Sequence, residues 1–311
     1  MRTNDGSAYS CLRRAQYDDS VKETSMDAPV GIIGLGRLGS AFAAALATSG
    51  TPVLVASRRP IADAWREVSG IEVVTAEALL ARCETVFLTV PDRAIAEVAA
   101  ALPWRSGQAV VHHSGALDLD ALAGAAARGA VAGCLHPLQT FPTGVRPQEA
   151  LALFRGIVCG VEAPEPLGSR LEALAARLGA QTVRLEGVDR ALYHAAAVLA
   201  SNDVVALMAA AARTWALAGL PPEAAREALA PLLLASAHNV TALPLERALT
   251  GPIARGDVAT VERHLHALAT APDLAVLYRA LAGELLTLDL GHPAEVTEAL
   301  SRALGEDAQA R

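Results

Sequence analysis

Four polar clusters stand out from a chain that is 52% hydrophobic. They are His112-His-Ser-Gly-Ala116, His136-Pro-Leu-Gln-Thr-Phe141, Tyr193-His194 with Ser201-Asn202, and Thr250-Gly-Pro-Ile-Ala-Arg-Gly-Asp257. An imidazole changes protonation near neutral pH, so these clusters suit general acid or base catalysis. Lys22 is the only lysine, and an arginine stays protonated. Proton chemistry elsewhere in the chain must therefore use His, Tyr, a carboxylate or water.

His112, Ser114 and His136 each follow closely on an apolar run that predicts a strand. On a parallel sheet this position is the carboxyl edge, where ligands bind. Alone, each would be interpreted as a hydrogen-bonded loop residue. Their joint position favours a ligand pocket.

A long alanine-rich segment, from about Asp189 to Ala218, is predicted to be one helix. Seven positions separate His194 from Ser201, which is close to two turns, and Asn202 lies roughly 80° around the helix from His194. All three side chains then face one cleft, with His194 as a catalytic acid and Ser201 and Asn202 as orienting groups. The alternative is that they make polar contacts between packed helices.

The segment from Thr250 to Asp257 combines turn residues with one guanidinium. Arg255 suits a clamp for a substrate carboxylate or phosphate, with Asp257 beside it in the pocket. Equally, Asp257 is a helix N-cap candidate and Arg255 a surface partner for it. Both interpretations fit the sequence.

The strongest positioning motif is Gly34-Leu-Gly-Arg-Leu-Gly39, between the apolar run Val30 to Ile33 and an alanine-rich helix. In a G-x-G-x-x-G motif the first glycine allows a tight turn and the second lets the backbone approach a pyrophosphate. The third allows the helix to pack on the strand, and the helix N-terminus faces the anion. The motif predicts dinucleotide binding.

The end of the second strand indicates which dinucleotide is bound. NAD-specific proteins carry an acidic residue there, whereas this chain has Ser57, Arg58 and Arg59. A hydroxyl and guanidinium groups can bind a 2′-phosphate that a carboxylate would repel, so we expect NADP(H). The nicotinamide would then lie beside His112, Ser114 and His136. The predicted cofactor-binding residues are Gly34, Leu35, Gly36, Arg37, Leu38, Gly39, Ser57, Arg58, Arg59, Val90 and Pro91.

Apolar, β-branched runs alternate with helical segments up to residue 187 and then stop. This pattern predicts an α/β fold: a doubly wound, mostly parallel Rossmann sheet over residues 29–187, followed by an all-helical domain over 188–311. Residues 1–28 are polar and are predicted to be a disordered tail. The long apolar helix cannot bury every face on one small domain, so we expect a homodimer.

Composition excludes several functions. The net charge is −7 and no basic cluster occurs with interleaved aromatics, which argues against nucleic-acid binding. No uninterrupted apolar stretch reaches the roughly 18 residues of a membrane span, and the first 28 residues lack a signal core, so a cytoplasmic protein is expected. The four cysteines show no C-x-x-C spacing, so they are interpreted as buried small residues, and no metal site is predicted.

Taken together, the glycine loop, Ser57-Arg58, Val90-Pro-Asp92 and the four polar clusters resemble a bacterial family of Rossmann-like proteins with a C-terminal helical domain of unknown function. The resemblance covers about Pro29 to Ala282. His113 is a departure, because the family usually has a smaller residue at this position. The family is similar to ketopantoate reductase, pyrroline-5-carboxylate reductase and 6-phosphogluconate dehydrogenase, several of which use a helical lysine as an acid. The resemblance implies that His194 takes the place of that lysine, and it makes 2-dehydropantoate a candidate substrate.

The sequence thus predicts an NADPH-dependent reductase that delivers hydride to the C=O, or the C=N, of a small carboxylate-bearing substrate. The alternative is a non-catalytic NADP(H)-sensing module whose helical domain binds a partner.

Overall fold

A computed structural model describes residues 28–58, 65 and 68–305 of the 311-residue chain. The chain folds into two compact units, one ending at Val198 and the other beginning at Leu199. The predicted tail, except for residue 28, lies outside the described residues.

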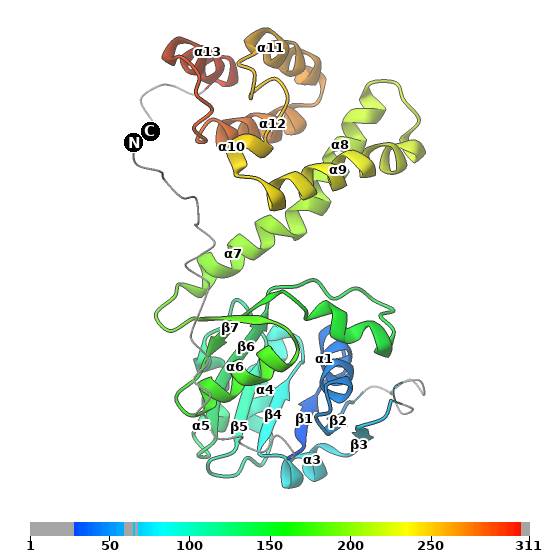
Figure 1. The fold of residues 1–311 in the computed structure, drawn as a ribbon, viewed down its shortest axis with the longest axis vertical. Helices are drawn as coiled ribbons and strands as arrows, with labels where there is room; N and C mark the ends of the chain where they lie inside the picture. Colours follow the sequence, from blue (N-terminus) through cyan, green and yellow to red (C-terminus); the bar gives the residue numbers. More distant parts are fainter. Residues whose placement is uncertain (1–27, 59–64, 66–67, 306–311) are drawn as a thin grey trace, which may run out of the picture. The chain divides into compact units, whose positions relative to one another are not determined.

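The first unit is built on one sheet with strand order β3-β2-β1-β4-β5-β6-β7-β8 in the described chain (Figure 1). The strands are β1 (Val30–Ile33), β2 (Val53–Ala56), β3 (Ile71–Val73), β4 (Thr85–Leu88), β5 (Ala109–His112), β6 (Val131–Pro137), β7 (Val158–Glu162) and β8 (Gln181–Arg184). Every neighbouring pair is parallel except β6 and β7. The predicted doubly wound, mostly parallel sheet is confirmed, because short β-branched runs form strands that can be buried on both faces.

Helices cover both faces of this sheet. One face carries α1 (Arg37–Thr48), η3 (Pro147–Leu153) and α6 (Leu167–Arg177). The other carries α3 (Ala76–Arg82), α4 (Asp92–Ala101), η2 (Leu119–Leu122) and α5 (Ala123–Ala126).

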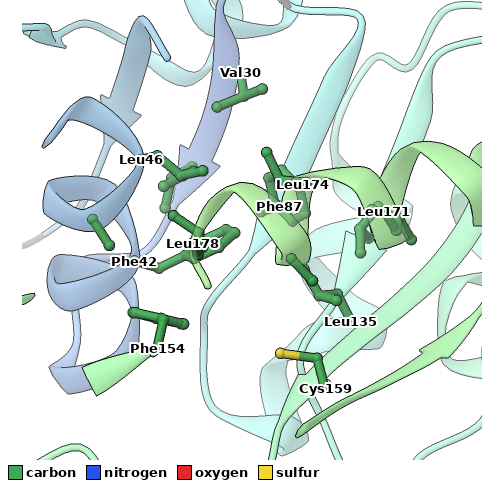
Figure 2. Close-up of a cluster of buried hydrophobic side chains, with 14 of the residues drawn as sticks. Val30, Phe42, Leu46, Phe87, Leu135, Phe154, Cys159, Leu171, Leu174 and Leu178 are labelled. Carbon is green, nitrogen blue, oxygen red and sulfur yellow. The ribbon is translucent and has the colours of Figure 1, made fainter. Parts of the chain in front are cut away.

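The core under α1 and α6 is drawn from widely separated parts of the sequence (Figure 2). Phe42 of α1 lies edge-on to Phe87 of β4, with ring centroids 5.0 Å apart, and Phe154 follows η3. Leu174 of α6 and Leu135 of β6 belong to the same cluster. Burying each such side chain contributes about 1.5–3 kcal/mol, so this cluster fixes α1 against the sheet and with it the loop that begins α1.

The strand order reverses at β1, which lies between β2 and β4. At such a switch point the loops after neighbouring strands diverge to opposite faces and leave a crevice at the carboxyl ends. The glycine loop follows β1, and Val90 and Pro91 follow β4.

The rest of the described chain is helical. Its elements are α7 (Arg190–Ala200), α8 (Asn202–Leu217), η4 (Pro222–Ala224), α9 (Ala225–Ala242), α10 (Leu245–Ala248), α11 (Val258–Ala267), η5 (Leu268–Thr270), α12 (Pro272–Leu285) and α13 (Ala294–Leu304). The predicted boundary at residues 187 and 188 falls before α7, whereas most of α7 belongs to the first unit. In the second unit, Val261, Leu265, Leu286 and Leu300 form a core among α11, α12 and α13.

Two expectations about the segment from 189 to 218 need correction. The predicted single helix is interrupted at Ser201, whose backbone angles of φ −132° and ψ −67° are not helical. Within the described residues, the stretch Arg190–Leu217 has a mean hydropathy of 1.7 and is long and apolar enough to cross a membrane. The sequence has no uninterrupted apolar run of this length, so no such stretch is predicted from it. The mean hydropathy is nevertheless high, because many alanines and leucines outweigh the isolated polar residues. One such stretch is weak evidence, since apolar helices of water-soluble proteins share these properties.

Candidate active site

The glycine loop has the geometry that its spacing predicts. Gly34 has a φ of +105°, which favours glycine, and its N–H donates to Ala56 O of β2 at 2.9 Å. A Cβ on Gly39 would lie 2.1 Å from Gly34 O and 2.4 Å from Thr89 Oγ1. Gly34 therefore makes the turn, and Gly39 allows α1 to pack directly on it.

The N-terminus of α1 is open to a ligand. A Cβ on Gly36 would meet nothing within 4 Å. Among the described residues no side chain caps the helix, and its first turn has no acidic residue, so the terminal N–H groups and the helix dipole favour an anion there. Arg37 begins the helix and is exposed, whereas Leu35 and Leu38 pack against the core and anchor the loop.

The end of β2 presents the residues predicted to select the cofactor. Ser57 and Arg58 follow Ala56 directly, and Arg58 is exposed. Its guanidinium is thus available to a phosphate. Arg59 lies outside the described residues.

The loops after β4 and β5 are tied together by Ser114. Its hydroxyl donates to Asp92 Oδ2 of α4 at 2.6 Å and accepts the N–H groups of Ala116 and Leu117. Val90 is partly buried and packs against the core, and Pro91 precedes α4. Ser114 is 4% exposed. Its hydroxyl therefore holds the loops after β4 and β5 together, which form one wall of the crevice, and it is not presented to a ligand.

His112 and His113 are part of the same wall. His112 Nδ1 accepts from Ser114 N–H at 3.1 Å, and Nε2 lies 3.2 Å from Asp118 O, so both nitrogens of this fully buried ring are engaged. Burial, and then the charge of Arg190, lower the pKa of His112 to about 4. Its expected place as a pocket residue is therefore corrected: the ring holds the loop after β5 in shape.

His113 packs among aromatic side chains of the core. Its ring centroid lies 4.9 Å from that of Phe42 and 5.5 Å from that of Phe87. Nδ1 contacts Leu135 O, whereas Nε2 is buried without a hydrogen-bond partner among the described residues. Burial lowers the pKa of His113 to about 3, so the ring is neutral at physiological pH.

Arg190 is a site residue that the sequence patterns did not reveal. It is 7% exposed at the start of α7, and its guanidinium donates to Ser114 O at 2.8 Å and to Gly115 O at 3.2 Å. It also forms an ion pair with Glu162 of β7 at 3.2 Å. Arg190 thereby attaches α7 to the loop after β5. A charged residue at the head of an otherwise apolar helix was the available signal.

Three rings gather where α7 meets this loop. His136 Nδ1 lies 2.9 Å from the hydroxyl of Tyr193, and the ring centroids of His136 and His194 are 6.1 Å apart. A Cβ on Gly115 would lie 2.7 Å from His194 Nδ1 and 2.8 Å from His136 Nε2. His194 Nδ1 is buried and has no hydrogen-bond partner in the described part of the chain. The structure thus brings His136, Tyr193 and His194 together.

The charge states of this cluster follow from its surroundings. Burial, and then the charges of His194 and Arg190, lower the pKa of His136 to about 4. Burial raises the pKa of Tyr193 to about 12. At neutral pH His136 is an uncharged imidazole and Tyr193 an uncharged phenol.

The remaining predicted residues belong to the second unit. The Ser201 hydroxyl donates to Asn202 Oδ1 at 3.0 Å, and because the helix is interrupted here the spacing used to place both beside His194 does not apply. Asp257 caps α11 by accepting from Thr260 N–H at 3.0 Å and from its hydroxyl at 2.7 Å. Arg255 is exposed. The contacts of Asp257 are therefore those of a helix N-cap.

Comparison with known proteins supports this two-part organisation. Residues 15–137 match the Rossmann-like domain, and residues 157–285 match a domain of unknown function, DUF2520. No curated protein sequence matches the chain.

Solved structures share the fold over most of the chain. A protein from Bacteroides fragilis assigned as an NADP oxidoreductase has 26% identity and a TM-score of 0.65, covering 84% of this chain and 98% of that chain. Protein TM1727 from Thermotoga maritima has 29% identity and a TM-score of 0.63, covering 87% and 98%. Plasmodium falciparum pyrroline carboxylate reductase with NADP bound has 13% identity and a TM-score of 0.57, covering 90% and 98%, and shares the fold. The resemblance that the sequence motifs indicated is thereby confirmed at the level of domains: a match to the Rossmann-like domain is followed by a match to the DUF2520 domain.

Proposed function

We propose that this protein is an NADPH-dependent reductase of a small carboxylate-bearing carbonyl or imine compound. The observation that carries the proposal is that an open, uncapped helix N-terminus at Gly36 belongs to the same unit as the partly buried cluster of His136, Tyr193 and His194. The solved structure at 26% identity, assigned as an NADP oxidoreductase, supports the same cofactor and reaction type.

The residues present fit NADP(H). Gly34 and Gly39 give the turn and the close packing, Gly36 leaves room for the pyrophosphate, and Arg58 is free to bind the 2′-phosphate. The bound nicotinamide would supply the hydride.

The protein would supply a proton and orientation. His194 is proposed as the general acid, because its ring lies in the cluster and its Nδ1 has no partner among the described residues. From the second unit, Arg255 is proposed to bind the substrate carboxylate and Ser201 and Asn202 to orient the substrate. The resemblance to ketopantoate reductase makes 2-dehydropantoate the first compound to test.

Turnover tests this proposal directly. Purified protein is incubated with NADPH and a panel of 2-oxo acids, including 2-dehydropantoate, and cyclic imines, while nicotinamide absorbance is followed. His194→Ala should lower kcat by about 100-fold or more and leave NADPH affinity nearly unchanged. His266→Ala, at an exposed position on α11, is the matched control. Unchanged turnover in His194→Ala would remove His194 from the mechanism, and NADPH binding without turnover of any compound would favour the sensing module.

We also propose that the protein is a homodimer joined through its second unit. All but two of the large apolar side chains exposed in the described chain lie at or after Leu199. On α9, Leu232 is 66% exposed and Leu234 is 69% exposed. Residues two positions apart point to nearly opposite sides of a helix, so α9 exposes large apolar side chains on both sides. A helix that is apolar all round is normally buried, and a second copy of the same chain would cover it symmetrically.

A further inference from the structure

We propose that Tyr193 is a positioning residue that holds His136 as its Nε2–H tautomer, so that His136 presents an N–H donor to a substrate carbonyl oxygen beside His194. The role toward substrate rests on the proposed reductase function, whereas the tautomer itself does not. The inference assigns a role to Tyr193 and selects C=O over C=N as the bond that is reduced.

The tautomer follows from the hydrogen atom of Tyr193. The phenol of the half-buried Tyr193 is uncharged at neutral pH, and its hydrogen needs an acceptor. His136 Nδ1, at 2.9 Å, is its hydrogen-bond partner in the described part of the chain. Gly160 packs closely against another side of the hydroxyl, since an added Cβ there would be 2.7 Å from the hydroxyl oxygen. Since the phenol donates to Nδ1, an uncharged His136 must carry its own hydrogen on Nε2.

The Nε2–H group faces the proposed acid. His136 Nε2 and His194 Nδ1 lie 2.8 Å and 2.7 Å from one point, the position that a Cβ of Gly115 would occupy. Gly115 therefore packs closely against both rings, with His136 Nε2 as a donor and His194 Nδ1 buried without a partner among the described residues. The proposed substrate oxygen would accept from His136 Nε2–H while His194 provides the proton.

The charges around His136 favour a carbonyl over an iminium substrate. The guanidinium carbon of Arg190 lies 5.7 Å from the ring centroid of Tyr193, and this fixed positive charge opposes one on His136 and would oppose one on a bound iminium group as well. The nearby carboxylates are engaged, since Asp92 accepts from Ser114 and Glu162 pairs with Arg190. An uncharged N–H donor instead stabilises the negative charge that develops on a carbonyl oxygen during hydride addition.

Nuclear magnetic resonance of the full chain labelled with ¹⁵N-histidine tests the tautomer without turnover. Long-range ¹H–¹⁵N correlations at neutral pH should show His136, assigned with a His136→Asn variant, as the Nε2–H form. Tyr193→Phe should convert it to a mixture of both tautomers. Tyr278→Phe is the matched control, because Tyr278 lies 3.0 Å from His264 Nδ1 in the second unit, and it should leave the His136 signals unchanged.

Three results would overturn the inference. A wild-type His136 in the Nδ1–H form, or one unaffected by Tyr193→Phe, would refute the positioning role whether or not the protein is a reductase. Reduction of cyclic imines but of no 2-oxo acid would refute the assignment to C=O. With a 2-oxo acid as substrate, Tyr193→Phe is expected to lower kcat by about 10-fold or more, with the affinity for NADPH unchanged.

Discussion

Replacing His113 with phenylalanine should make the first unit less sensitive to acid. In the folded protein burial lowers the pKa of His113 from 6.5 to about 3, whereas in the unfolded chain the ring is in water. Between these two values the unfolded state binds the extra proton, so the free energy of unfolding falls as the pH falls. The folded ring remains neutral at pH 5, so the loss depends on the pKa of His113 in the unfolded chain. Between pH 7 and pH 5 the free energy of unfolding should fall by about 2 kcal/mol through this residue.

Urea unfolding at pH 7 and pH 5 measures this difference. Trp104 is 6% exposed in the same unit and serves as the fluorescent probe when Trp65 and Trp215 are replaced by phenylalanine. Phenylalanine suits the aromatic contacts with Phe42 and Phe87 but forfeits the hydrogen bond to Leu135 O, which lowers stability equally at both pH values. The change between pH 7 and pH 5 should be about 2 kcal/mol smaller in His113→Phe than in the parent. Between pH 8 and pH 9 the two proteins should respond alike, and equal responses at acid pH would refute the reasoning.

Four other variants probe the cofactor site and the dimer. Arg58→Asp should weaken NADPH binding by about 10-fold or more and NADH binding far less, and equal losses in titration calorimetry would remove Arg58 from the 2′-phosphate site. Gly36→Ala should weaken NADPH binding without changing the thermal midpoint of unfolding. Gly39→Ala, whose Cβ would lie 2.1 Å from Gly34 O, should lower both the affinity for NADPH and the thermal midpoint. An unchanged midpoint in Gly39→Ala would contradict the packing described. Light scattering should give a mass near twice 32.1 kDa for the wild type and a monomer for Leu232→Glu with Leu234→Glu, and an unchanged mass would refute the interface.

The sheet was predictable because local sequence determines it. Runs such as Val53–Ala56 and Val131–Pro137 are short, apolar and bounded by turn residues, and they can be buried from both sides wherever the fold places them. The glycine loop was predictable for a similar reason, since Gly34 and Gly39 act within one turn of chain. The interruption at Ser201 was not, because alanine-rich sequence on both sides favours helix and the break is a single residue.

The roles of individual polar residues could not be predicted, because they depend on partners far away in the sequence. Ser114 is engaged by Asp92, and His112 by the backbone of its own loop, so two residues expected to face a ligand instead form the wall. The spacing of histidines showed which segments follow strands but not which ring nitrogens would be left free.

Arg190 shows how a partner far away in the sequence sets both the position and the charge of the polar cluster. Its guanidinium reaches Ser114 O and Gly115 O from the start of α7, which places Tyr193 and His194, one turn further along, against the loop that carries Gly115. The same positive charge favours the uncharged form of His136. The ion pair between buried Arg190 and partly buried Glu162 therefore couples the position of the proposed acid to the charge of the proposed donor, and removing Glu162 would leave the buried charge of Arg190 uncompensated.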